Sequence, residues 1–266
     1  MNILDRAVTL LGRGFSVLPI MVNGSKKPTI PWKKLQSRCL TSAEAAGCFN
    51  DRVGIGILGG HVSGGLEVID FDALGFFDRW REAVKKVAPG LLERLPHVIT
   101  PTGGHHIYLR HHGNVDGNCK LAYTRAKDGS LSIAVETRGE GGYVLTVGSP
   151  ARCHQYNEIY DYAEDSVSIE DTPTLTKSER DILVKIAQSL DETPPCPSPQ
   201  ADAFQPTSAT GTRPGEEFAA KTPWAEILEP HGWRFSHKHA GLAAGVKVVA
   251  ASMNVIRCVE WVPDLG

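Results

Sequence analysis

The stretch LEVIDFDA, Leu66–Ala73, decides how the fold of this 266-residue chain is interpreted. Its apolar, β-branched composition is typical of a strand, in which successive side chains point to opposite faces. That period sends Ile69 and Phe71 to one face. Asp70 and Asp72 then share the other face, where like charges repel unless water, a partner or a cation compensates. Carboxylates suit Mg²⁺ or Mn²⁺, so the stretch predicts either a divalent-metal site or a solvated strand end.

Two later stretches, HHIYLR and LSIAVETRG, repeat this alternation. The first places His106 and Tyr108 on one face, and the second does the same with Glu136 and Arg138. If the three strands are neighbours in one sheet, these groups converge with the two aspartates. An antiparallel sheet with one solvated face would alternate in the same way. The combination of acids, imidazole and guanidinium favours a site that binds a metal–nucleotide complex.

The order of the elements predicts an α+β fold with a mixed or antiparallel sheet and flanking helices, because strands outnumber helices without a regular βαβ alternation. A turn at 61–65 predicts that the strands on either side of it form a hairpin. We expect strands at 15–19, 53–60, 66–73, 97–100, 105–112, 131–139 and 141–148. We expect helices at 5–14, from Thr41 with a capping box to Glu44, at 76–94 and at 173–190.

Composition limits the class of protein. The net charge of −2 gives no general support for nucleic-acid binding, so such a function must depend on a local site. The six cysteines include no C-x-x-C pair, which argues against a disulfide framework and a standard zinc site. No apolar run approaches the about 18 residues of a membrane span, and the N-terminus lacks a secretory cleavage signal. We therefore expect a cytoplasmic protein without a membrane partner.

The chain divides by composition into three parts. Residues 1–190 contain the patterned segments and are expected to form one domain. Residues 191–216 are rich in Pro, Ser, Thr and Ala and poor in core residues, which predicts a flexible linker. Residues 217–266 form a short C-terminal segment, in which TPWAEILEPHGW has a weak helical pattern.

Over about residues 1–165, the chain resembles the N-terminal domain of bifunctional DNA primase-polymerases (prim-pol), in the archaeo-eukaryotic primase superfamily. VIDFDA resembles the first motif of that group, TPTGGHHIYLR the second and VETRGEGGYVLTVGSP the third. KKPTIPW and VGIGIL stand where the group carries a Lys-Pro…Trp element and a glycine-punctuated strand. An ordered set of motifs is more specific than any one of them.

The resemblance implies an archaeo-eukaryotic primase-like catalytic core and a role for each motif residue. Asp70, Asp72 and Glu136 correspond to the catalytic, metal-binding acids. His106 corresponds to the histidine that holds the phosphates of the incoming nucleotide, with His105 as the adjacent competitor.

Three further residues are expected to bind nucleotide: Arg138, Tyr108 and Lys27. Arg138 ranks above Lys27 because its place on the Glu136 strand is fixed, whereas Lys27 lies in a loop.

The implied activity is metal-dependent, template-directed nucleotidyl transfer with Mg²⁺ or Mn²⁺, in plasmid, phage or mobile-element replication. Its partners would be a DNA template and primer and nucleoside triphosphates. TPWAEILEPHGW resembles a primase–helicase connecting region, so a replicative helicase in the same or a separate chain is a further expected partner. Two other functions fit the residues: a metal-dependent nuclease, and a non-catalytic single-stranded DNA-binding replication module.

Overall fold

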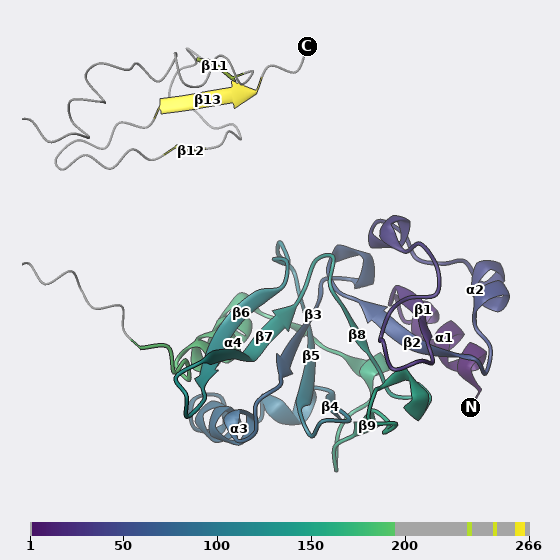
Figure 1. Cartoon of the computed structure of the whole chain (residues 1–266), viewed down its shortest axis with the longest axis horizontal. Coiled ribbons are helices and arrows are strands. Elements are labelled where there is room, and N and C mark those ends of the chain that lie inside the picture. Colours follow the sequence, from purple (N-terminus) through teal and green to yellow (C-terminus); the bar gives the residue numbers. More distant parts are fainter. Residues whose placement is uncertain (1, 195–232, 236–246, 249–258, 264–266) are drawn as a thin grey trace, which may run out of the picture. The chain divides into compact units, whose positions relative to one another are not determined.

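Residues 2–194 form two β-sheets that share one hydrophobic layer (Figure 1). The computed structural model describes these residues and also 233–235, 247–248 and 259–263. The larger sheet has the strand order β6-β7-β3-β5-β4-β9, with β10 paired to the end of β5, and the smaller sheet has the order β1-β2-β8. The strands are β1 Val17–Met21, β2 Val53–Leu58, β3 Leu66–Phe71, β4 His97–Ile99, β5 His105–His111, β6 Cys119–Arg125, β7 Leu131–Arg138, β8 Tyr143–Leu145, β9 Asp161–Tyr162 and β10 Thr174–Leu175.

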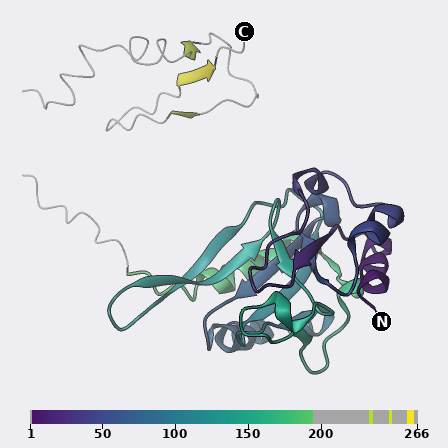
Figure 2. The ribbon, with the colours of Figure 1, turned by 45° about the vertical axis from the view of Figure 1, so that its right-hand side comes forward.

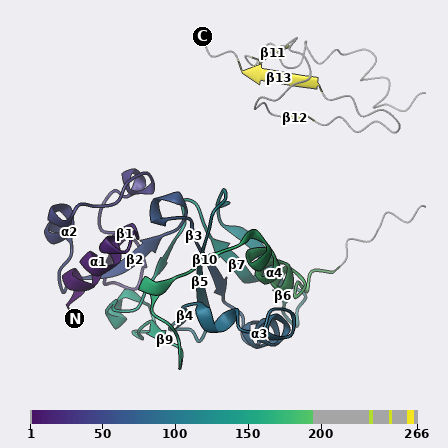
Figure 3. The same ribbon diagram turned by 180° about the vertical axis from the view of Figure 1, so that it is seen from behind.

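Helices flank both sheets. In the described part of the chain the α-helices are α1 Ile3–Gly12, α2 Ser42–Cys48, α3 Phe76–Val87 and α4 Lys177–Gln188. α3 and α4 cover one face of the larger sheet (Figure 3), whereas α1 and α2 pack with the smaller sheet. The strand pairs of these two sheets are antiparallel apart from β5 with β10. The α+β class predicted from the sequence is therefore confirmed.

β3 lies at the centre of the larger sheet and is buried along its whole length. Ile69 and Phe71 pack on the helical side, where the Phe71 ring lies 5.0 Å from the ring of Trp80 in α3. Leu66 and Val68 face the other way, into the layer shared with the smaller sheet. The alternative of an open, solvated sheet face is therefore wrong for most of β3, because the smaller sheet covers that face.

Local sequence signals account for several helix ends. Thr41 caps α2, and its hydroxyl and backbone exchange hydrogen bonds with Glu44 in the expected capping box. The expected helix at 76–94 is shorter, because α3 ends at Val87 before Pro89 and Gly90, and a short 3-10 helix follows. Proline and glycine both disfavour helix continuation.

The predicted hairpin is reduced to one antiparallel bridge between Gly60 and Leu66, and β2 and β3 themselves do not pair. β2 pairs with β1 and β8 in the smaller sheet, whereas β3 pairs with β5 and β7 in the larger one. The turn between them, with Gly60, Gly64 and Gly65 all at positive φ, carries the chain from one sheet to the other. β6 and β7 do form a hairpin, which is long (Figure 2), although β6 is absent from the strands predicted above.

α4 is fixed to the larger sheet by a buried ion pair. Arg180 donates from Nε and Nη2 to the two carboxylate oxygens of Glu67 on β3, at 2.6 and 2.7 Å, and Glu67 is fully buried. The indole N–H of Trp80 donates to the Leu183 carbonyl of α4 at 3.0 Å. α4 is thus part of the domain that contains β3.

The chain continues past α4 along β6. The carboxylate of Asp191 accepts from the backbone N–H of Tyr123 at 2.8 Å. Most of the expected linker, from residue 195 on, and the weak helical pattern at 222–232 lie outside the described residues. β11 Trp233–Phe235, β12 Lys247–Val248 and β13 Val259–Pro263 pair in the order β11-β13-β12. The three-part division of the chain remains a prediction.

Candidate active site

One cross-strand row of the larger sheet carries two acids and a histidine. Asp70 on β3 lies opposite Glu136 on β7 and opposite His106 on β5. Directly opposed residues of neighbouring strands project to the same face, so the three side chains lie together. At Gly104, before β5, a side chain would collide with the backbone carbonyl oxygen of Phe71. The glycine therefore lets the turn that precedes the histidines approach the end of β3.

Asp72 completes a group of three carboxylates. It follows β3 directly, and its backbone N–H donates to the Ala134 carbonyl at 3.0 Å. One ligand oxygen from each of Asp70, Asp72 and Glu136 lies within 4.8 Å of the others. Within the residues that the structure describes, no other set of His, Cys, Asp and Glu converges in this way. Three hard oxygen ligands at this spacing fit Mg²⁺ or Mn²⁺.

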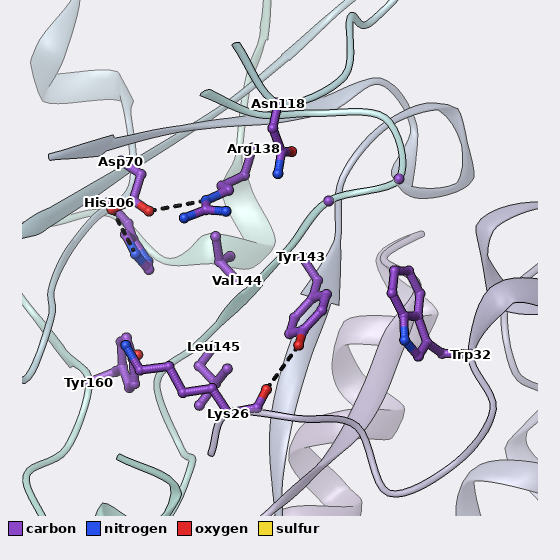
Figure 4. Close-up of a pocket in the computed structure, with 12 residues that line it drawn as sticks. Lys26, Trp32, Asp70, His106, Asn118, Arg138, Tyr143, Val144, Leu145 and Tyr160 are labelled. Carbon is purple, nitrogen blue, oxygen red and sulfur yellow. Dashed lines mark hydrogen bonds and ion pairs between the residues drawn. The ribbon is translucent and has the colours of Figure 1, made fainter. Parts of the chain in front are cut away.

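Arg138 connects two of these acids. Its Nε lies 3.3 Å from Asp70 Oδ2 (Figure 4). Its Nη2 lies 2.5 Å from Glu136 Oε1. His106 approaches the other oxygen of Asp70, with Nε2 at 3.4 Å from Oδ1. That oxygen is buried and has no hydrogen-bond partner among the described residues. A buried carboxylate oxygen without a donor is unfavourable unless a cation satisfies it, so the donor set fits a metal.

The three acids differ in how readily they ionise. Burial would raise the pKa of Asp70, but His106 and Arg138 outweigh it, and this pKa lies below its usual value. Burial and then the Asp70 charge raise the pKa of Asp72. Burial likewise raises the pKa of Glu136, with Arg138 opposing and the two aspartates adding to the shift. A bound divalent cation would favour ionisation of all three.

His105 and His106 lie on opposite faces of the larger sheet. His105 stacks on Phe77 of α3 with ring centroids 4.0 Å apart, and its Nδ1 lies 2.9 Å from His97 Nε2. His106 is buried beside Asp70, and its ring lies 5.8 Å from that of Tyr160. His106 is therefore the histidine on the face that carries the acids.

Two expected nucleotide ligands are not brought to the site. Tyr108 shares the face of His106 but is fully buried in the layer between the sheets, where its ring meets that of His106 edge-on. It packs against His106 and does not line the pocket beside the acids. Lys27 is exposed and does not line the pocket beside the acids, whereas its neighbour Lys26 does.

The pocket beside the acids has a volume of about 360 Å³ and is lined by residues of both sheets. Asp70, His106 and Arg138 come from the larger sheet, and Tyr143 comes from β8 of the smaller one (Figure 4). Tyr143 meets Trp32 edge-on, with centroids 5.4 Å apart. The full lining is Lys26, Trp32, Asp70, His106, Asn118, Arg138, Gly141, Gly142, Tyr143, Val144, Leu145 and Tyr160. Cationic and aromatic groups beside an acid cluster suit a phosphorylated ligand with a planar base.

The comparison with protein families agrees with this chemistry. Residues 7–175 match Prim-Pol, the family described as bifunctional DNA primase/polymerase, N-terminal. The chain belongs to the Prim-Pol family. No curated protein matches the Prim-Pol chain. None of its described helices has the length and hydropathy of a membrane span.

The Prim-Pol match confirms the resemblance inferred from the motifs. It includes all ten strands of the two sheets and ends at Leu175, before α4. A Prim-Pol domain implies DNA and nucleotides as substrates, and the enzymes of this family are metal-dependent. The α+β architecture is consistent with a primase-like core.

The sequence pattern of this Prim-Pol domain missed several pocket residues. Asn118 and Tyr160 precede β6 and β9, in loops without a strand or helix period that would orient them. Trp32 belongs to the KKPTIPW element, but the sequence pattern did not predict that it lines the pocket. Lys26 stood in the same element, and no rule based on alternation could separate it from Lys27.

Proposed function

We propose that this Prim-Pol chain is a metal-dependent DNA primase/polymerase that joins nucleotides on a DNA template. The proposal rests on the row of Asp70, Glu136 and His106, joined by Asp72, of which Asp70 and His106 line the pocket. Acids that converge within 4.8 Å beside a pocket of nucleotide size are what nucleotidyl transfer requires.

Asp70, Asp72 and Glu136 together would hold Mg²⁺ or Mn²⁺. Two cations bound there would activate the primer 3′-hydroxyl and stabilise the pyrophosphate leaving group. Asp70 is suited to hold a cation, because its pKa is lowered and its Oδ1, 3.4 Å from His106 Nε2, has no hydrogen-bond partner among the described residues. Asp72 and Glu136 would contribute the remaining carboxylates, and a bound cation would favour their ionised forms.

His106 and Arg138 would bind the phosphates of the incoming nucleotide. His106 is held by β5 and by the packed ring of Tyr108, so it can orient a phosphate without reorganising. Arg138 is partly exposed at the pocket, and its guanidinium can move from the carboxylates to a phosphate. The catalytic contribution of these residues is positioning and charge compensation.

The test is nucleotide incorporation on a primed DNA template by the Asp70→Ala, Asp72→Ala and Glu136→Ala variants. Each should fold, since these side chains lie apart from the packed Ile69 and Phe71 face. Activity with Mg²⁺ or Mn²⁺ should fall by about 10² or more, because the groups that hold the cations are lost. Asp51→Asn, an exposed acid outside the pocket, is the matched control and should retain activity.

The same assay separates polymerase from nuclease. The labelled primer should lengthen only when dNTPs are present, and it should not shorten without them. Primer degradation that depends on Asp70, without extension on any template, would favour the nuclease instead. A strand-binding module without catalysis is less well supported. Of its two base-stacking candidates, Tyr108 is buried, and Tyr143 lines the pocket and donates to the Lys26 carbonyl.

The two adjacent histidines provide a second test with its own control. His106→Ala should weaken dNTP binding and raise KM, because His106 faces the acids. His105→Ala should change KM much less and lower thermal stability instead, because His105 packs on Phe77. Equal effects on KM would contradict the role proposed for His106.

The replication context follows from the resemblance of the chain to plasmid and phage replication proteins. A replicative helicase, in the same or a separate chain, is the partner suggested by the TPWAEILEPHGW segment. The cytoplasm is the compartment that fits a DNA substrate. Co-purification of the full chain with a helicase encoded by the same plasmid, phage or mobile element would test the proposed helicase partner.

A further inference from the structure

We propose that Lys26, and not its neighbour Lys27, is the lysine that grips the triphosphate of the bound nucleotide, and that Tyr143 holds it in position. This inference rests on the proposed function, because it assumes that the pocket binds a nucleoside triphosphate. The sequence and its family resemblance pointed instead to Lys27, which precedes Pro28.

The backbone of Lys26 is in an unusual conformation. Its φ of 59° lies in the left-handed region, which disfavours residues with a Cβ. The other described non-glycine residues with positive φ are Asn157 and Asp165, whose residue types tolerate that region. Such a conformation persists only where the surroundings impose it, and it is common at ligand sites.

Tyr143 contacts the backbone of Lys26. Its hydroxyl donates to the Lys26 carbonyl at 3.0 Å (Figure 4). The tyrosine is itself fixed by β8 and by its edge-on contact with Trp32. On the following residue, the Lys27 carbonyl accepts from the Met21 N–H at 2.8 Å, which ties the loop to β1. The two carbonyl contacts hold the loop on both sides of the Lys26–Lys27 peptide.

The Lys26 side chain crosses the pocket toward Tyr160 (Figure 4). The ring of Tyr160 lies 5.8 Å from that of His106, the expected phosphate ligand. The ammonium group thus lies on the phosphate side of the pocket.

Lys26 is also available for a ligand. It forms no ion pair with another of the described residues, in contrast to Arg138, which is engaged by Asp70 and Glu136. It enters from the loop after β1, opposite the acids on the larger sheet. A triphosphate would therefore be held from both sides, by cations on the acids and by the Lys26 ammonium.

The experiment compares Lys26→Met with Lys27→Met, which remove the same charge from adjacent positions. Affinity for dNTP, dNDP and dNMP is measured by calorimetry with Ca²⁺ present, so that no turnover is needed. Lys26→Met should weaken dNTP binding by about tenfold or more, the size expected for a lost charge-assisted hydrogen bond. The effect should shrink for dNDP and nearly vanish for dNMP. Lys27→Met should stay within about twofold of wild type.

Two further variants separate binding from folding. Lys26→Gly accepts positive φ without strain, so it should unfold at the same or a higher temperature than wild type while binding dNTP as weakly as Lys26→Met. Tyr143→Phe keeps the ring and removes the hydroxyl, and it should weaken dNTP binding by a few-fold with the same dependence on phosphate number. A Tyr143→Phe protein with wild-type affinity would remove the positioning role.

The outcomes distinguish the two proposals. If Lys26→Met and Lys27→Met weaken dNTP binding equally, or if the loss is the same for dNMP, the assignment of Lys26 is wrong while the proposed function stands. If the wild-type protein binds no dNTP, the proposed function itself is wrong.

Discussion

His97 and His105 form an imidazole pair on the helical side of the larger sheet, away from the acids. A hydrogen bond of 2.9 Å joins His97 Nε2 to His105 Nδ1, and both rings lie against Phe77. One ring must donate the proton that the other accepts, so both can be neutral but both cannot be charged. Burial lowers the pKa of His97 to about 4, and burial also lowers that of His105.

This pair should make the protein less stable in mild acid. A histidine with a lowered folded pKa is protonated more readily in the unfolded chain, so stability is lost as pH falls from about 6.5 toward 4. Because His97 is only partly buried, we expect it to account for about 1–2 kcal/mol of that loss. The measurement is the free energy of unfolding of wild type and His97→Gln between pH 7 and pH 4.5.

His112→Gln, a change at an exposed histidine, is the control for the acid measurement. The wild type and His112→Gln should lose stability alike, and His97→Gln should lose less. Identical pH profiles for all three proteins would contradict the role of the buried pair.

At the scale of single residues, the sequence predicted the acid row but not the pocket around it. The two-residue period of β3, β5 and β7 was enough to put Asp70, Glu136 and His106 on a common face. Period alone also put Tyr108 there, because it does not show where the smaller sheet covers that face. The placement of Lys26 involves a left-handed backbone torsion and a hydrogen bond from the Tyr143 hydroxyl, and a sequence pattern predicts neither of them.

The ion pair of Glu67 and Arg180 attaches α4 to the larger sheet. Glu67 has no exposed surface, and the Arg180 side chain is 17% exposed. Removing one partner of a buried pair leaves an uncompensated charge in the core, which usually destabilises a protein by about 3–5 kcal/mol. The same helix carries a surface pair, Arg94 with Glu179 at 2.7 Å, in which the arginine is about half exposed.

We therefore expect Arg180→Leu to destabilise the protein by about 3–5 kcal/mol and Arg94→Leu by about 1 kcal/mol or less. The double variant Glu67→Leu/Arg180→Leu should recover much of the loss, because no charge is left buried. Denaturant unfolding of the three proteins measures this. Similar losses for Arg180→Leu and Arg94→Leu would show that the buried pair is not what attaches α4.

The sequence predicts a helix end correctly where a local signal determines that end. Thr41 and Glu44 specify the start of α2 through side chains three residues apart, and Pro89 explains the end of α3. The hairpin of β2 and β3 was predicted wrongly because strand partners are chosen by contacts far along the chain. β2 pairs with β8, whose residues come some ninety positions later, and no feature of the turn at 61–65 indicates this.

At the scale of the whole molecule, the expected boundary after the Prim-Pol domain can be tested by proteolysis. Composition predicts that 191–216 cannot bury enough apolar surface to fold, so a protease of broad specificity should cut there first. Proteinase K is suitable, because the one basic residue in that stretch, Arg213, precedes a proline that hinders trypsin.

Asp191 and Glu192 accept hydrogen bonds from residues of β6. We therefore expect the protease-resistant fragment to end near residue 194. Mass spectrometry of the digest identifies its end. Early cleavage inside residues 1–165 with 195–216 still intact would contradict this division of the chain.

The strand order also has a consequence for synthesis on the ribosome. β3 leaves the exit tunnel well before β5 and β7, which complete it, and β2 waits still longer for β8. The carboxylate of Glu67 lies 3.6 Å from His111 Nε2, but it gains its arginine partner only when Arg180 is translated, 113 residues after it. A nascent chain that stops before β8 therefore has neither sheet complete, and one that stalls before α4 lacks the Arg180 partner of Glu67, so such chains should depend on chaperones.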